Sequence, residues 1–218
     1  MKEEEINEIK KAWIPNKSLT KIINKKDYYI EDEAFIHKNE FLDCSFTGSV
    51  ENAELKQNLF TKCSFEKFKM RSFLINNIIF DKSYTLNTII KDSKIIRTEF
   101  NNSKLLGMTF DTCSGNDITF LNSNCQFVNF RKTQFKRTIF ENCILREADF
   151  QGADLRGVIF NNCDLREAEF SFAILDGVNF CNSRIEGIKI QSNTLHGAVV
   201  DYHQAAYLGA KYLGLKIN

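Results

Sequence analysis

Apolar residues recur along this chain at every fifth position. Residues 53–202 divide without a break into 30 pentapeptides, and the third residue of each, the centre, falls on a multiple of five. Thirteen centres are Phe, seven Leu, five Ile, one Val and one Met; only Thr85, Gly115 and Cys125 depart. The residue two before the centre is small in most units, and the other positions are mostly polar.

A period of five fits neither regular element alone, because a helix repeats its face every 3.6 residues and a strand every two. A chain that turns a corner every five residues does fit it. The centre and the residue two before it then both point inward, as alternate residues of a short strand do. The pattern predicts a coil with an apolar interior and a polar outside.

A second period of 20 residues lies over the first. Every fourth centre from Phe60 to Phe180 is Phe, and the columns that begin at Leu55, Phe65 and Met70 are also mainly apolar. Four pentapeptides per turn predict a square coil in which like side chains stack. At a strand spacing of about 4.8 Å, about seven and a half turns give a rod roughly 36 Å long.

The register changes once near the start of the coil. Three further pentapeptides begin at Ala34, Asn39 and Cys44, shifted by one position, and residues 49–52 join the two registers. The predicted organisation is therefore a non-repeat N-terminal cap (1–33), the solenoid (34–202) and a C-terminal helix (203–218).

Both ends of such a coil need covering, because a solenoid otherwise exposes unpaired backbone and apolar side chains. Residues 3–13 look helical, with Ile6, Ile9 and Trp13 on one side and Pro15 after them. This segment is interpreted as the N-terminal cap in preference to a partner-binding helix.

The last residues break the period of five and predict a helix, with Asp201 as N-cap and Gln204 completing a capping box. The helix either plugs the last turn or forms the seam of a homodimer, and one helix can do both. The residues at helical spacing that we expect in the cap or seam are Tyr202, Ala205, Ala206, Gly209, Tyr212 and Leu213.

Little in the sequence indicates catalysis. The seven Cys contain no CxxC pair, and most of them occupy the small inward position, where Cys behaves as a small apolar residue. The three His are scattered, and nucleotide-binding, hydrolase and metalloprotease motifs are missing. We therefore expect no metal, no cofactor and no enzymatic activity. Without a signal-like N-terminus or a long apolar stretch, a cytoplasmic protein is expected.

Several units resemble the pentapeptide-repeat family, whose consensus is A(D/N)LXX. They are ADFQG, ADLRG, CDLRE and AEFSF, which start at Ala148, Ala153, Cys163 and Ala168. The resemblance covers residues 34–202 and implies an all-β fold, the right-handed quadrilateral parallel β-helix of that family.

The resemblance also implies a role in binding. Some pentapeptide-repeat proteins bind DNA gyrase or topoisomerase IV and protect them from quinolones, with rods that resemble duplex DNA in width and negative charge. A quinolone-resistance (Qnr-like) protein that dimerises through its C-terminal helix is therefore one hypothesis. A generic protein-interaction scaffold without a topoisomerase role is the alternative.

Charge divides the rod along its length. Residues 56–137 carry 14 basic and six acidic side chains, whereas residues 138–202 carry five basic and 10 acidic ones. The acidic half is the candidate partner-binding surface, and its residues are Glu141, Asp149, Asp154, Asp164, Glu169 and Asp176. Direct nucleic-acid binding through residues 131–137 is not expected, because no aromatic side chains interleave with the basic ones on one face. Phe127 and Phe172 fall on outward positions and are candidate contacts.

Overall fold

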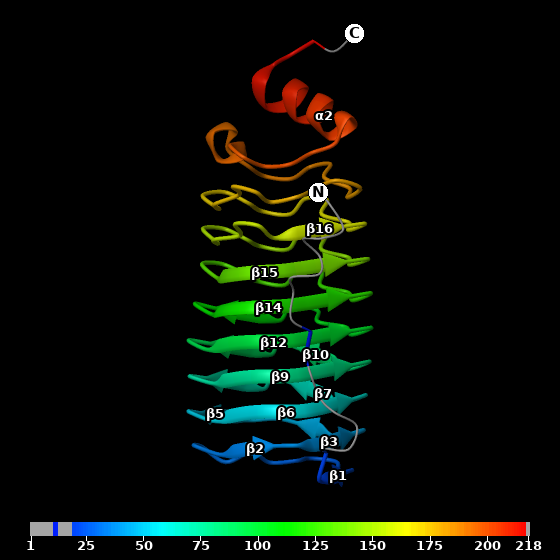
Figure 1. Ribbon diagram of the computed structural model, residues 1–218, viewed down its shortest axis with the longest axis vertical. Helices are drawn as coiled ribbons and strands as arrows, with labels where there is room; N and C mark the ends of the chain where they lie inside the picture. The colour runs from blue at the N-terminus through cyan, green and yellow to red at the C-terminus, as the bar shows by residue number, and fades with distance from the viewer. Residues whose placement is uncertain (1–10, 13–18, 217–218) are drawn as a thin grey trace.

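The computed structural model describes residues 11–12 and 19–216. They form a parallel β-solenoid of about seven turns with one helix at its C-terminal end. In Figure 1 the turns stack vertically, from β1 at the bottom to the red helix α2 at the top. The predicted parallel coil and C-terminal helix are confirmed. The helix predicted over residues 3–13 lies outside the described residues, apart from residues 11–12.

The strands lie in three parallel sheets along the sides of the rod. The long-strand sheet runs in the order β1, β3, β6, β9, β12, β14, β15 and β16, with β2 also paired to β6, and the other sheets are β10-β7-β4 and β13-β11-β8-β5. The bounds are β1 Lys21–Ile23, β2 Phe35–His37, β3 Asn39–Leu42, β4 Ser45–Phe46, β5 Ser49–Glu51, β6 Glu54–Thr61, β7 Ser64–Glu66, β8 Lys69–Arg71, β9 Leu74–Asp81, β10 Tyr84–Leu86, β11 Ile89–Lys91, β12 Lys94–Asn101, β13 Thr109–Asp111, β14 Ser114–Leu121, β15 Gln134–Glu141, β16 Ile159–Asn161, the 3₁₀ helix η1 Ser192–Leu195 and α2 Tyr202–Leu213.

A backbone corner recurs every five residues. The residue two after each centre has positive φ at every unit from Asn52 to Gly187, and most of these residues are not glycine. Asn, Asp and Gly tolerate this left-handed conformation best. Four such corners per 20 residues give the coil its four sides, and the centres between them point inward.

The 20-residue period sets the pairing between turns. Phe80 pairs with Phe100, Phe100 with Phe120 and Phe120 with Phe140 in neighbouring strands. Their rings stack with centroid distances of 4.9, 4.8 and 4.5 Å and almost parallel planes. A second Phe column through Phe130 stacks in the same way, so the predicted ladders form the core.

The register change lies where the sequence predicts it. Phe46 pairs with Phe65, 19 residues later, whereas Val50 pairs with Met70, 20 residues later. Val50 is buried and serves as the centre of the four-residue piece 49–52. One short unit therefore resets the coil without breaking the stack.

Residues 19–33, which contain no pentapeptide, close the N-terminal end. Strand β1 pairs with β3, and Ile30 is buried. The ring of Tyr28 packs edge-on against Phe41 with centroids 5.0 Å apart. This partial turn covers the first aromatic rings of the core.

Helix α2 covers the opposite end. Asp201 accepts a hydrogen bond from the Gln204 backbone N–H, and the Gln204 side chain completes the predicted capping box. The Gln204 amide also donates to the carbonyls of Phe180 (2.6 Å) and Ser183 (2.7 Å), so it binds two acceptors of the last turn. The plug interpretation of this helix has direct contacts behind it.

Candidate protein-binding surface

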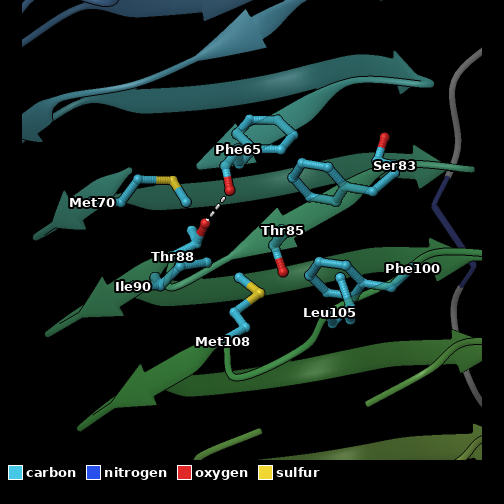
Figure 2. A pocket seen from close by; sticks show the side chains of 10 residues that line it. Phe65, Met70, Ser83, Thr85, Thr88, Ile90, Phe100, Leu105 and Met108 are labelled. Carbon is cyan, nitrogen blue, oxygen red and sulfur yellow. Dashed lines mark hydrogen bonds between the residues drawn. The ribbon is translucent and has the colours of Figure 1, made fainter. Parts of the chain in front are cut away.

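The interior is filled by side chains and holds one small hollow next to Thr85, among the cavities found in the described part of the chain. The cavity measures about 10 Å³ and lies among Phe65, Met70, Phe100 and Met108. Figure 2 shows the Thr85 hydroxyl in this apolar space, where it makes no hydrogen bond, while Thr88 donates to the Phe65 carbonyl. A cavity of this size holds about one water molecule and cannot admit a substrate.

The cysteines form hydrogen bonds within the wall of the coil. The Sγ atoms of Cys63, Cys143 and Cys163 each donate to a carbonyl of the preceding turn at 3.3 Å. Ser83 and Ser123 make the same contact in the same column. The inward Cys is thus more than the small apolar residue expected from the sequence, since it also satisfies a buried carbonyl.

Burial makes these thiols poor nucleophiles. It raises the pKa of Cys63 and of Cys113 to about 12, so both stay protonated near neutral pH. Within the described ranges, no three His, Cys, Asp or Glu side chains come together as metal ligands. The chemistry available to this protein therefore lies on its outer surface.

The candidate acidic residues do not form one patch. Asp149 and Glu169 stand one above the other in adjacent turns, joined by a parallel bridge. Asp154 and Asp164 belong to other columns, where they pair with Gln134 and with Ile144. Glu141 is at the end of β15, in yet another column. Counted around the 20-residue turn, only two of the six share an azimuth.

Arginine side chains neutralise much of this acidity. Asp164 contacts Arg146 at 2.6 Å and Arg166 at 2.7 Å, and Asp154 contacts Arg156 at 2.7 Å. The hydrogen bond from Arg156 lowers the pKa of Asp154. These carboxylates present ion pairs to a partner, unlike the unpaired phosphates of a DNA backbone.

The basic stretch 131–137 is partly paired as well. Arg131 contacts Asp149 at 3.6 Å, and the Arg137 guanidinium contacts Asp117 at 2.7 Å. Lys132 and Lys136 are exposed. This stretch offers too few free cations for the strong phosphate binding that a duplex requires.

Two aromatic corners flank the side of the rod that carries the stacked carboxylates. Phe127 is 54% exposed and Phe172 is 66% exposed, and both have positive φ, 59° and 61°. Phe127 stands at the corner before residues 128–131, and Phe172 at the corner after residues 168–171, two turns further along. We call Phe127, Arg131, Asp149, Glu169 and Phe172 the aromatic–acidic face.

A bulky residue in this conformation is strained, at a cost of about 1–2 kcal/mol per corner. Gly107 and Gly187 occupy the corner of Phe127 in other turns, and Gly152 that of Phe172. Strained exposed residues are typical of functional sites. The sequence marked both Phe as outward, but it did not show that they flank Asp149 and Glu169.

The predicted cap or seam residues of α2 point largely away from the coil. Tyr202, Ala205 and Leu213 are exposed, whereas Gly209 is buried. The contacts to the last turn come instead from Gln204, Leu208, Tyr207, Lys211 and Tyr212. An apolar hollow of about 210 Å³ beside the helix is lined by residues including Leu195, Val200, Leu213 and Leu215.

Comparison with known proteins agrees with this architecture. The family model described as "Pentapeptide repeat region" matches residues 93–170, and that described as "Pentapeptide repeats (8 copies)" matches residues 163–187. Curated protein sequences give no match.

Two similar solved structures are trypsin-treated QnrB1, a plasmid-mediated fluoroquinolone resistance protein, and HetL from the cyanobacterium Nostoc sp. strain PCC 7120, involved in heterocyst differentiation regulation. QnrB1 is 22% identical, with 90% of this chain and 97% of that one covered and a TM-score of 0.40. HetL is 13% identical, with 82% and 87% covered and a TM-score of 0.43. Neither likeness says what this chain binds.

Stacked parallel turns of four five-residue sides, filled inside by ladders of Phe and Leu, define a β-solenoid built from pentapeptides. The chain belongs to the pentapeptide-repeat family. None of the helices in its described residues is long and apolar enough to cross a bilayer.

Proposed function

We propose that this protein is a non-enzymatic binding protein that docks a protein partner on its aromatic–acidic face. The observation that carries the proposal is the pair of exposed Phe side chains held at strained corners on either side of Asp149 and Glu169. Aromatic side chains are enriched among the residues that dominate binding energy at protein interfaces. The interior, with a cavity of about 10 Å³, supports a binding role over a catalytic one.

A type II topoisomerase is the partner suggested by the resemblance to quinolone-resistance members of the family. The paired carboxylates shape how such binding works. Because Arg146, Arg156 and Arg166 neutralise acidic side chains, affinity for gyrase depends on Phe127 and Phe172 more than on charge mimicry of DNA. Binding therefore changes little between low and moderate salt, unlike the binding of DNA itself.

The active form is a homodimer joined through the C-terminal end. The support is the exposed Tyr202 and Leu213 and the apolar hollow of about 210 Å³ beside α2. A second copy placed there leaves the aromatic–acidic face of each protomer open. Gel filtration of the full chain and of a Leu213→Asp variant tests this: a monomer in both cases contradicts the dimer.

Gyrase supercoiling with and without ciprofloxacin tests the partner. The wild-type chain should preserve supercoiling in the presence of the drug, and the double variant Phe127→Gly/Phe172→Gly should lose this effect. Glycine relieves the strain at both corners, so the variant stays folded. Asn122→Gly, on another corner, is the matched control and should protect like the wild type.

Each outcome separates the hypotheses. If the wild-type chain neither inhibits gyrase nor protects it at micromolar concentration, the topoisomerase role is wrong. A pull-down that recovers another protein with the wild-type chain and with Asn122→Gly, but not with the double Phe variant, then supports the scaffold alternative on the same face. If the double variant protects gyrase fully, the aromatic–acidic face is not the binding site.

A further inference from the structure

The outer side of the long-strand sheet carries an unusual apolar column. In each turn the residue before the Phe centre points outward, toward solvent. These residues, called the outer column, are Leu59, Ile79, Glu99, Thr119, Ile139 and Ile159. A hollow of about 330 Å³ continues the column past Ile159 toward Val199. Outward positions of a solvated coil are polar by default, so four large apolar side chains here need a cover.

Part of the column is in fact shielded from solvent. Ile139 is 7% exposed and Ile159 is 9% exposed. Ile144 and Ile174 hold the same position of their pentapeptides on other sides, and they are 41% and 48% exposed. The matched comparison indicates that atoms outside the sheet lie over the outer column at the level of β15 and β16.

The start of the chain reaches this column. The backbone N–H of Ala12 donates to Glu99 Oε1 at 2.9 Å, and Glu99 Oε2 accepts from the Asn101 side chain at 3.1 Å. Thr20, only eight residues after Ala12, donates its N–H to the Lys38 carbonyl, four strands away at the other end of the sheet. The chain before β1 therefore returns along the outside of the rod, up to β12.

We infer that residues 1–10 form a strap that packs over the outer column from β14 to β16. Ala12 fixes where the strap starts, and Ile159 lies three turns beyond Glu99, about 14 Å at a strand spacing of about 4.8 Å. Ten residues span about 15 Å as a helix and about 33 Å when extended, so either form reaches.

The composition of the strap fits the surface it covers. Ile6 and Ile9 supply apolar side chains for Ile139 and Ile159, and the acidic run at positions 3–5 faces exposed Lys136 and Arg156, which stand in one column on the same side of the rod. The strap hides apolar area that would otherwise be free to associate with other chains. It also ties the N-terminal and C-terminal halves of the rod together across several turns.

The single Trp of the chain, Trp13, directly follows Ala12 and reports on the strap. In the wild-type protein its emission should be blue-shifted and weakly quenched by acrylamide. The double variant Ile139→Lys/Ile159→Lys should shift the emission to the red and raise the quenching constant severalfold. Ile144→Lys/Ile174→Lys is the matched control, with the same residues changed on other sides, and should leave Trp13 as in the wild type.

Ile6→Ser/Ile9→Ser changes the strap itself and leaves the solenoid core intact, so it gives the same readout if the Lys variant fails to fold. Trypsin should cut at Lys10 and Lys11 severalfold faster in this variant than in the wild type. The inference is wrong if Trp13 is already fully quenchable in the wild-type protein, or if neither variant changes it. It is also wrong if the Lys variant converts a dimer to a monomer in gel filtration while Trp13 emission stays constant, because a second copy then covers the column.

Discussion

Each corner of the coil puts one residue at positive φ, and the side chain there sets a local free energy. Asn102, Asn122, Asn142 and Asn162 form one column of corners, and their amides hydrogen-bond from turn to turn at 3.4, 3.1 and 2.7 Å. Asparagine tolerates the left-handed conformation and its amide both donates and accepts. It therefore suits a corner that repeats at the same azimuth.

The centres contribute most of the stability per residue. Phe120→Ala should destabilise the protein by about 3–5 kcal/mol, because it opens a cavity between the rings of Phe100 and Phe140, whose centroids lie 4.8 and 4.5 Å away. Urea unfolding measures the loss. Asn122→Gly, two residues further, keeps the corner unstrained and should cost less than about 1 kcal/mol. Equal losses at the two positions would contradict the inward and outward assignment.

Thr85 is a centre that can be improved. Thr85→Leu removes a buried hydroxyl without a partner and fills the adjacent cavity, so stability should rise by about 1 kcal/mol and the melting temperature with it. Thr98→Leu is the control. Thr98 is also buried, but its hydroxyl donates to the Ile96 carbonyl at 3.1 Å, so this change should destabilise. A decrease in melting temperature for Thr85→Leu would sink the explanation.

The inward residues could be predicted from the sequence because they depend only on the period. Gly115 shows the limit of that reasoning. A Cβ there would lie 2.6 Å from the Ile118 side chain and 2.6 Å from the Ile95 carbonyl oxygen. A small centre is thus matched to a bulky neighbour three residues later, and such volume compensation follows from packing in three dimensions rather than from the pattern.

At the scale of the element, α2 shows which information is local. The capping box between Asp201 and Gln204 is encoded within four residues, so the sequence was enough to predict it. The side of the helix that meets the coil depends on its tilt over the last turn. The sequence placed the contact stripe on Tyr202, Ala205 and Leu213, yet these are exposed.

Gln204 joins the helix to the solenoid, and its removal should loosen both. Gln204→Ala removes half of the capping box and leaves the carbonyls of Phe180 and Ser183 without their donor, with an expected cost of about 2–3 kcal/mol. Hydrogen exchange should accelerate in residues 178–190 and stay slow in β12. His203→Ala, an exposed neighbour on the same helix, is the control. Unchanged exchange in both variants would show that α2 does not secure the last turn.

At the scale of the whole molecule, the charge asymmetry seen in the sequence is real in number but not in effect. Counting by 20 already separates Asp154 and Asp164 from the column of Asp149 and Glu169. The pairing of Asp164 with Arg146 and Arg166 requires side-chain geometry, and it turns an apparent acidic half into a surface of ion pairs. The candidate site was predictable as a set of residues but not as one surface.

Stability should fall at alkaline pH. In the unfolded chain the thiols of Cys63 and Cys113 have their ordinary pKa near 9.0, and in the folded protein burial raises the pKa to about 12. Between these values the folded protein holds protons that the unfolded chain releases, so stability is full below about pH 9 and decreases as the pH rises through the window. Urea midpoints should be lower at alkaline than at neutral pH. The double variant Cys63→Ser/Cys113→Ser should show a weaker dependence, and an identical slope would contradict the assignment.

The 20-residue register makes length and direction independent properties of this protein. Inserting one complete turn between two Phe of the same ladder would move everything beyond it by about 4.8 Å along the axis and leave every column on its own side. An insertion of five residues would instead rotate all later columns by one side. A lineage, or an engineer, can therefore change how far apart two docking points stand while keeping them aimed the same way.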